Sequence, residues 1–118
     1  MKVSFDFDST LTRPCIQKFA QSLVTSGYEV HITTSRCFSG YGMIYDNSDL
    51  FIVADKVGIK RDNITFTQGN FKTGYLDSEF LFHLDDDKYE IDRIKHIPCV
   101  NVKHKFSIRK CREILENE

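Results

Sequence analysis

The chain has 118 residues, of which 41% are hydrophobic and 28% charged, and 16 Lys and Arg against 17 Asp and Glu give a formal net charge of −1. This size and composition are typical of one folded domain with one core, and they exclude a disordered or fibrous chain. The balanced charge provides no overall attraction to nucleic acid, although it leaves room for a local basic patch.

The N-terminus and the cysteines indicate the compartment. A strand-like pattern begins at Lys2, without the apolar core of a signal peptide, and no apolar run is long enough to cross a bilayer. The four cysteines show no Cys-x-x-Cys pair and no zinc-ligand spacing, so we expect reduced thiols. We therefore expect a cytoplasmic protein with no membrane partner, and its oligomeric state is left open.

Strands and helices are predicted to alternate along the chain. Residues 2–7 form a strand pattern, and residues 14–26 repeat apolar side chains at helical spacing after Pro14, which suits a first helical turn. Gly27 and Gly58 mark helix ends, and Asn47, Asp87 and Ser107 are candidate N-caps. Further strands are predicted at 28–33, 63–67, 79–84 and 99–102, further helices at 47–57, 71–78, 87–96 and from 107 onward, and a Gly-rich aromatic loop at 37–45.

This alternation predicts the α/β class, a Rossmann-like three-layer α/β/α fold with a mostly parallel five-stranded sheet and right-handed crossovers. No repeat or Pro/Ser-rich linker divides the chain, so residues 1–118 are expected to form a single domain. Ligands of such sheets bind at the carboxyl ends of the strands.

Acidic residues follow two of the predicted strands. Asp6 and Asp8 are separated by one residue, so a locally extended backbone would aim both carboxylates to the same side. Asp85, Asp86 and Asp87 follow the apolar run 80–84, at the same edge of the predicted sheet. Carboxylates brought together repel unless a cation lies among them, and hard oxygen ligands suit Mg²⁺.

A carboxylate-bound metal at this edge would neutralise phosphate oxygens, and an ionised Asp can act as a nucleophile while its neighbour transfers protons. Phosphoryl transfer also needs hydroxyl or amide donors and a positive charge for the remaining phosphate oxygens. Thr34 and Ser35, at the end of the second strand, and Lys72 are available for these roles.

In their order along the chain, these motifs resemble the haloacid dehalogenase superfamily, whose phosphatases carry DxDx[TV], a strand-ending Thr or Ser, a Lys and a terminal acidic pair. The resemblance covers roughly residues 1–95. It implies Asp6 as the nucleophile that forms an aspartyl-phosphate, Asp8 as the general acid and base, and Thr34 and Lys72 as phosphoryl ligands. The presence of Asp8 favours a phosphatase over a dehalogenase.

The resemblance also implies the magnesium ligands, which are the carboxylate of Asp6, the backbone carbonyl of Asp8, and Asp86 or Asp85. Asp86 is preferred, because the second member of the acidic pair looks like the ligand in related sequences. Ser9 stands where many relatives have Gly and still fits a small-residue turn. No long insertion follows Thr34, so the chain resembles capless members, which act on large substrates or borrow a neighbouring subunit as a lid. The loop 36–45 is expected to substitute in part for the missing cap.

Each residue alone has a simpler structural interpretation. Thr34 is equally a β-branched strand residue, Lys72 a solvated lysine and Asp87 a helix cap. His31 and His83 are interpreted as packed or hydrogen-bonded structural residues. Arg36 and Lys88 flank the expected site and are candidates for substrate contact, although charged residues just beyond strands are usually solvated. The ordered set as a whole favours the functional interpretation.

The predicted function is therefore a Mg²⁺-dependent phosphomonoester hydrolase. The stretches 34–36 and 83–87 resemble nucleotidase-type and polynucleotide-end phosphatases, so a nucleotide or polynucleotide-end phosphate is the leading substrate class, with sugar phosphates as an alternative. Two other functions are weighed against it. A receiver-like signalling domain would need an acid at the end of the third strand, which this chain lacks, and a catalytically silent phosphate- or Mg²⁺-binding domain would have no need of Asp8.

Overall fold

The computed structural model describes residues 1–118 and contains a five-stranded parallel sheet in the order β5-β2-β1-β6-β7. The strands are β1 (Lys2–Phe5), β2 (Glu29–Thr34), β5 (Ile64–Phe66), β6 (Phe80–Asp85) and β7 (Cys99–Asn101). Strand β1 is central, and its Val3, Ser4 and Phe5 are fully buried, as expected for a parallel sheet covered on both faces. The predicted fold class is confirmed.

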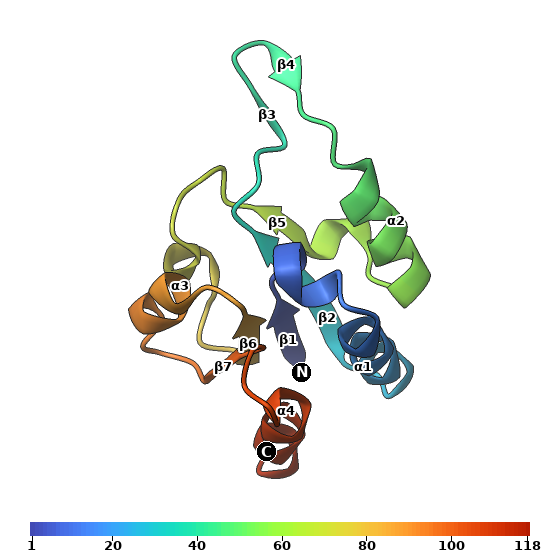
Figure 1. Ribbon diagram of the computed structural model, residues 1–118, viewed down its shortest axis with the longest axis vertical. Helices are drawn as coiled ribbons and strands as arrows, with labels where there is room; N and C mark the ends of the chain where they lie inside the picture. The colour runs from blue at the N-terminus through green and yellow to red at the C-terminus, as the bar shows by residue number, and fades with distance from the viewer.

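Four α-helices and three shorter helices connect the strands (Figure 1). The α-helices are α1 (Pro14–Thr25), α2 (Ser48–Val57), α3 (Lys88–Arg93) and α4 (Ser107–Glu116). The shorter helices are η1 (Phe7–Leu11), η2 (Arg61–Asn63) and η3 (Lys72–Tyr75). None of the helices is both long and apolar enough to span a membrane.

Apolar contacts define the layers on the two faces of the sheet. Helices α1, α2 and α4 share the larger core, and Cys111 of α4 belongs to it. In this core Phe5 packs edge to face against both Phe19 and Phe82, and the rings of Phe19 and Phe82 are stacked on each other. Helix α3 and the segment after η3 cover the opposite face with a smaller cluster of Leu76, Phe80, Ile94 and Ile97. The result is the predicted three-layer arrangement.

Several local predictions are corrected by the structure. The segment 71–78 forms only the short 3₁₀ helix η3, and the helix predicted at 87–96 is limited to α3. The loop predicted at 37–45 contains a small hairpin of β3 (Ser39–Gly40) and β4 (Met43–Ile44), which projects from the molecule at the top of Figure 1.

Two of the predicted helix-end residues act as predicted, and two do not. Gly58 ends α2 in the left-handed conformation, with φ of 96°, as its position predicts. Asp87 caps α3, because its carboxylate accepts a hydrogen bond from the Tyr89 amide. Asn47 makes no capping hydrogen bond, since its side chain contacts Arg36 and the Cys37 carbonyl instead. Ser107 is the first residue of α4, so the N-cap position falls on Phe106.

Candidate active site

Because all five strands run parallel, the residues that follow them meet at one edge of the sheet. Asp6 follows β1, Ser35 follows β2, and Asp85 ends β6 with Asp86 immediately after it. A cavity of about 630 Å³ opens at this edge, and these residues line it together with Asp8 and Lys72. The structure therefore brings six of the seven predicted site residues to one cavity.

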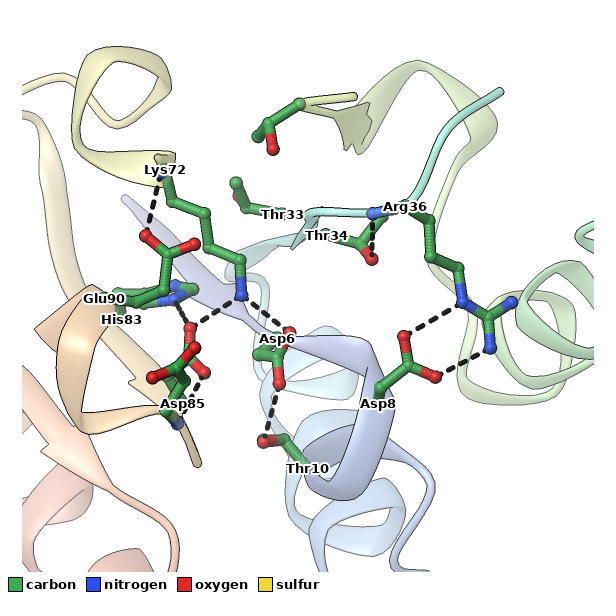
Figure 2. Close-up of polar contacts among 12 residues, drawn as sticks. Asp6, Asp8, Thr10, Thr33, Thr34, Arg36, Lys72, His83, Asp85 and Glu90 are labelled. Carbon is green, nitrogen blue, oxygen red and sulfur yellow. Dashed lines mark hydrogen bonds and ion pairs between the residues drawn. The ribbon is translucent and has the colours of Figure 1, made fainter. Parts of the chain in front are cut away.

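Lys72 connects the acids that follow β1 and β6. Its Nζ lies 2.7 Å from Asp6 Oδ1 and 2.7 Å from Asp85 Oδ2 (Figure 2). The Lys72 amide donates to Glu90 Oε1 at 3.1 Å, which fixes the start of η3 against α3. Burial lowers the pKa of Lys72, but the charges of Asp6 and Asp85 outweigh it and raise the pKa above its usual value. Lys72 is therefore a buried, charged residue, and not a solvated one.

Three carboxylates form a compact acidic cluster, with one oxygen each from Asp6, Asp85 and Asp86 lying within 4.8 Å of one another. Burial, followed by the charge of Asp85, raises the pKa of Asp6 to about 8. Lys72 is the one cation paired with these acids. The ionised cluster therefore carries excess negative charge on hard oxygen donors, which fits a divalent cation such as Mg²⁺.

Asp85 and Asp86 differ in their environments. Asp85 is fully buried, and its carboxylate is engaged by Lys72, by His83 and by the Asp87 amide. Asp86 is half-buried, lines the cavity and has no cationic partner. Of the two candidate ligands, Asp86 therefore has the more available oxygens.

A buried hydrogen-bond chain supports Asp85 from beneath the site. Burial raises the pKa of Asp85, but the hydrogen bond from His83 and the charge of Lys72 outweigh it and hold the pKa well below its usual range. Burial lowers the pKa of His83, so this neutral ring donates from Nε2 to Asp85 at 2.7 Å. Its Nδ1 then accepts from the Ser4 hydroxyl at 2.9 Å, and Ser4 Oγ lies 2.8 Å from Thr33 Oγ1.

Asp8 lines the same cavity as Asp6, but its carboxylate is bound by Arg36. Arg36 Nη2 lies 2.7 Å from Asp8 Oδ1, and Nε lies 2.9 Å from Asp8 Oδ2 (Figure 2). The same guanidinium contacts both carboxylate oxygens of Asp49 in α2, at 2.7 and 2.8 Å. These hydrogen bonds to Asp49 and Asp8 raise the pKa of Arg36. Arg36 is therefore paired with two carboxylates, and the solvated alternative for this residue is not what the structure shows.

The two hydroxyl-bearing residues at the end of β2 lie in different environments. Thr34 is fully buried and does not line the cavity, and its Oγ1 accepts from the Arg36 amide at 3.2 Å. Ser35, the next residue, lines the cavity. A hydroxyl at this strand end is thus present, but Ser35 and not Thr34 faces the open space.

Sequence reasoning missed the supporting role of Thr10 and the partner of His83. Thr10 donates its hydroxyl to Asp6 Oδ2 at 3.1 Å, and the signal for it is its place four residues after Asp6 in the turn that forms η1. His83 was interpreted as a packed or hydrogen-bonded structural residue, and it is fully buried and contacts Asp85, a partner that was not predicted. Its position two residues before Asp85 in a strand, which places both side chains on the same face, could have indicated this contact.

The hairpin does not cover the site. None of the residues from 36 to 71 lines the cavity, although the loop 36–45 was expected to close over it in part.

Comparison of the chain with protein-family models, curated proteins and solved structures finds no match.

Proposed function

We propose that this chain is a Mg²⁺-dependent phosphomonoester hydrolase that acts through an aspartyl-phosphate on Asp6. The observation that carries the proposal is the meeting of Asp6, Lys72 and Asp86 in one cavity at the carboxyl edge of the sheet. A buried lysine between two aspartates, beside a third and partly exposed one, is an arrangement suited to binding a phosphate with a cation.

The chain's own contacts orient the nucleophile. Lys72 holds Asp6 Oδ1 at 2.7 Å and Thr10 holds Oδ2 at 3.1 Å, so the carboxylate has little rotational freedom. An ammonium has three N–H donors, and two of those of Lys72 are used by Asp6 and Asp85. The third is available for a phosphate oxygen, and the Ser35 hydroxyl offers another donor in the cavity.

The reaction proceeds in two displacements at phosphorus. An oxygen of Asp6 forms a bond to phosphorus while the bond to the leaving oxygen breaks, and Asp8, which enters this step in its protonated form, donates that proton to the leaving oxygen. Asp8 then takes a proton from a water molecule, the water oxygen bonds to phosphorus, and the bond to Asp6 breaks. Phosphate is released with Asp6 and Asp8 restored.

Mg²⁺ held by Asp6 and Asp86 would supply the positive charge that keeps Asp6 ionised and neutralises the phosphate oxygens. Burial and the charge of Asp85 raise the pKa of Asp6, so a cation bound beside it would favour the ionised, nucleophilic form. Asp85 keeps Lys72 charged and in place.

The proposed substrates are phosphomonoesters with large leaving groups of nucleotide type. The resemblance of residues 34–36 and 83–87 to nucleotide-directed phosphatases supports this class, and the absence of hairpin residues from the cavity lining leaves the site open to such groups. Sugar phosphates belong in the test panel as the alternative.

The test is phosphate release from an aryl phosphate, a nucleotide panel, phosphorylated oligonucleotides and sugar phosphates, with Mg²⁺ and with EDTA. Asp6→Asn should abolish turnover while the circular dichroism spectrum stays unchanged, and Asp8→Asn should slow hydrolysis by at least about 100-fold. Asp62→Asn, which neutralises an exposed acid before β5, serves as the matched control and should retain full activity. Unchanged turnover in Asp6→Asn would refute the proposal, and silence across the panel would favour a catalytically silent binding domain.

A further inference from the structure

Basic residues are concentrated in one part of the chain. The twenty positions from Arg93 to Arg112 contain no Asp or Glu, whereas the whole chain holds 17 of them. The same stretch holds seven of the 16 Lys and Arg of the chain: Arg93, Lys95, Lys103, Lys105, Arg109, Lys110 and Arg112. The net charge of −1 therefore conceals a strongly basic segment.

This basic segment adjoins the candidate active site. The chain leaves β7 at Asn101, beside the end of β6, and runs to α4 (Figure 1). Asn101 and Lys103 line the active-site cavity, while Val102, His104, Lys105 and Phe106 line a second cavity of about 310 Å³. Because side chains of alternate residues in one short segment face the two cavities, the cavities are neighbours.

The second cavity has a positively charged and partly apolar wall. Arg13, Lys105 and Arg109 line it, with no acidic residue among its ten lining residues. None of these cations forms an ion pair, and neither does Lys103 or Lys88 at the active-site cavity. Arg13 Nε also donates to the Ser9 carbonyl at 2.8 Å, which joins this wall to the turn that carries Asp8.

Phe106 supplies an exposed aromatic ring in the middle of these cations. Its side chain is 46% exposed, and the Arg109 guanidinium and the Lys105 ammonium lie 5.0 and 5.5 Å from the ring centroid. The turn that presents it is held by its own hydrogen bonds, from the Phe106 amide to His104 Nδ1 at 3.1 Å and from the His104 amide to the Asn101 carbonyl at 3.0 Å. The ring and the cations are therefore presented by an ordered segment.

We propose that the segment 101–109 is a track for single-stranded nucleic acid, which leads the strand to the active-site cavity by its phosphorylated end. This inference rests on the proposed function for the end that reacts, whereas the track itself is a binding surface. Unpaired cations would contact successive backbone phosphates, and a base would stack on Phe106, which is how single strands are bound without sequence preference. On the other side of the active-site cavity, Tyr89, with a 74% exposed side chain, offers a second ring next to Lys88.

The binding test uses Asp6→Asn in Mg²⁺ and the unmodified chain in EDTA, so that no substrate is consumed. Fluorescence anisotropy of a labelled, end-phosphorylated oligothymidylate of about 12 nucleotides gives Kd across a range of KCl concentrations. Lys105→Ala/Arg109→Ala should weaken binding and reduce the slope of log Kd against log salt by about 1.4, since each phosphate contact on a single strand contributes roughly 0.7. The matched control is Lys56→Ala/Lys60→Ala, at exposed lysines near the end of α2, and it should bind like the unmodified chain.

The Phe106→Ala variant distinguishes binding of nucleic acid from binding of other polyanions. Loss of one stacked base should weaken oligonucleotide binding about tenfold. Binding of inorganic polyphosphate of similar charge, measured by competition, should remain within about twofold, because polyphosphate has no base to stack. If Phe106→Ala weakens both ligands equally, or neither, the surface is not a nucleic-acid track.

Hydrolysis then tests whether the track feeds the active site. For substrates of one to about eight nucleotides, phosphorylated at the 3′ or the 5′ end, kcat/KM should rise with length for one of the two ends. The double variant Lys105→Ala/Arg109→Ala should show no increase of kcat/KM with oligonucleotide length. Its kcat/KM should fall more for the octamer than for an aryl phosphate. Length-independent kcat/KM overturns the track while leaving the phosphatase. Salt-dependent oligonucleotide binding without any phosphate release overturns the phosphatase while leaving the track as a binding surface.

Discussion

Arg36 connects the proposed acid-base residue to the body of the protein. Its guanidinium donates two hydrogen bonds to Asp8, of 2.7 Å from Nη2 and 2.9 Å from Nε, and two more to Asp49. This makes it a positioning residue, because it acts through Asp8. A lysine preserves the charge but cannot hold two carboxylates in this geometry.

We therefore expect Arg36→Lys to lower kcat about tenfold or more for any phosphomonoester the chain hydrolyses, with a smaller change in KM, because proton transfer depends on alignment. Steady-state kinetics gives the two parameters separately. The matched control is Arg61→Lys, at an exposed arginine that pairs with Asp55, and it should keep kcat within about twofold. An equal loss in both variants would mean that the contact with Asp8 has no positioning role.

His83 is the residue whose importance depends most on burial. It is fully buried between Ser4 and Asp85, so its removal leaves a buried carboxylate with one donor fewer and a buried hydroxyl with one partner fewer. His83→Ala should lower the free energy of unfolding by about 2–3 kcal/mol. Urea unfolding measures the change, and Gln21→Ala, at an exposed position of α1, should stay within about 0.5 kcal/mol.

At the scale of elements, α4 is attached to the core through Cys111. This side chain is fully buried in the cluster that also holds Phe19, and burial raises the pKa of its thiol to about 12 from a usual 9.0. Above pH 9 the thiol of the unfolded chain loses its proton while that of the folded chain keeps it. Ionisation therefore favours the unfolded state, and stability is lost as the pH rises from 9 towards 12.

The expected result is a free energy of unfolding that falls more steeply with pH above 9 in the unmodified chain than in Cys111→Ala. The difference in slope should approach about 1.4 kcal/mol per pH unit, the value for one proton. Urea titrations between pH 8 and 10.5 measure both slopes, and Cys15→Ala, at an exposed cysteine, is the control that should leave the slope unchanged. Parallel curves for the unmodified chain and Cys111→Ala would contradict the assignment.

At the scale of the whole molecule, cation binding at the acidic cluster, as proposed above, would be coupled to folding. Asp6 and Asp86 come from segments 80 residues apart, so the unfolded chain has no such site. A cation that binds only the folded state adds stability by mass action, about 2.7 kcal/mol at 100 times its Kd. We expect MgCl₂ to raise the melting temperature of the unmodified chain.

Asp86→Asn should remove most of that increase, because it takes a negatively charged oxygen away from the cluster. Differential scanning calorimetry at constant ionic strength, with KCl replacing MgCl₂, separates site binding from screening. Asp87→Asn controls for the loss of one charge at the same helix start, since Asp87 caps α3 outside the acidic cluster. An equal magnesium response in the unmodified chain and Asp86→Asn would exclude Asp86 as a ligand.

Local patterns in the sequence were enough to predict the α/β class, the five strands and most of the residues at the candidate site. Apolar periodicity marks strands and helices locally, and in a parallel sheet every strand end lies at one edge, so Asp6, Ser35, Asp85 and Asp86 could be grouped without coordinates. Gly58 and Asp87 were equally readable, because helix ends depend on local backbone geometry.

The hydrogen-bond and ion-pair partner of each polar side chain, in contrast, depends on the three-dimensional fold. Arg36 and Lys72 have the same local appearance as solvated cations, and their pairing with Asp8 and with Asp6 and Asp85 depends on segments that are distant in sequence. The same holds for His83 with Ser4, for the buried position of Thr34, and for the adjacency of the basic segment 101–109 to the cavity. The periodicity of apolar residues carries no information about such contacts, because they depend on which strands lie next to one another in the sheet and on which side chains that arrangement buries.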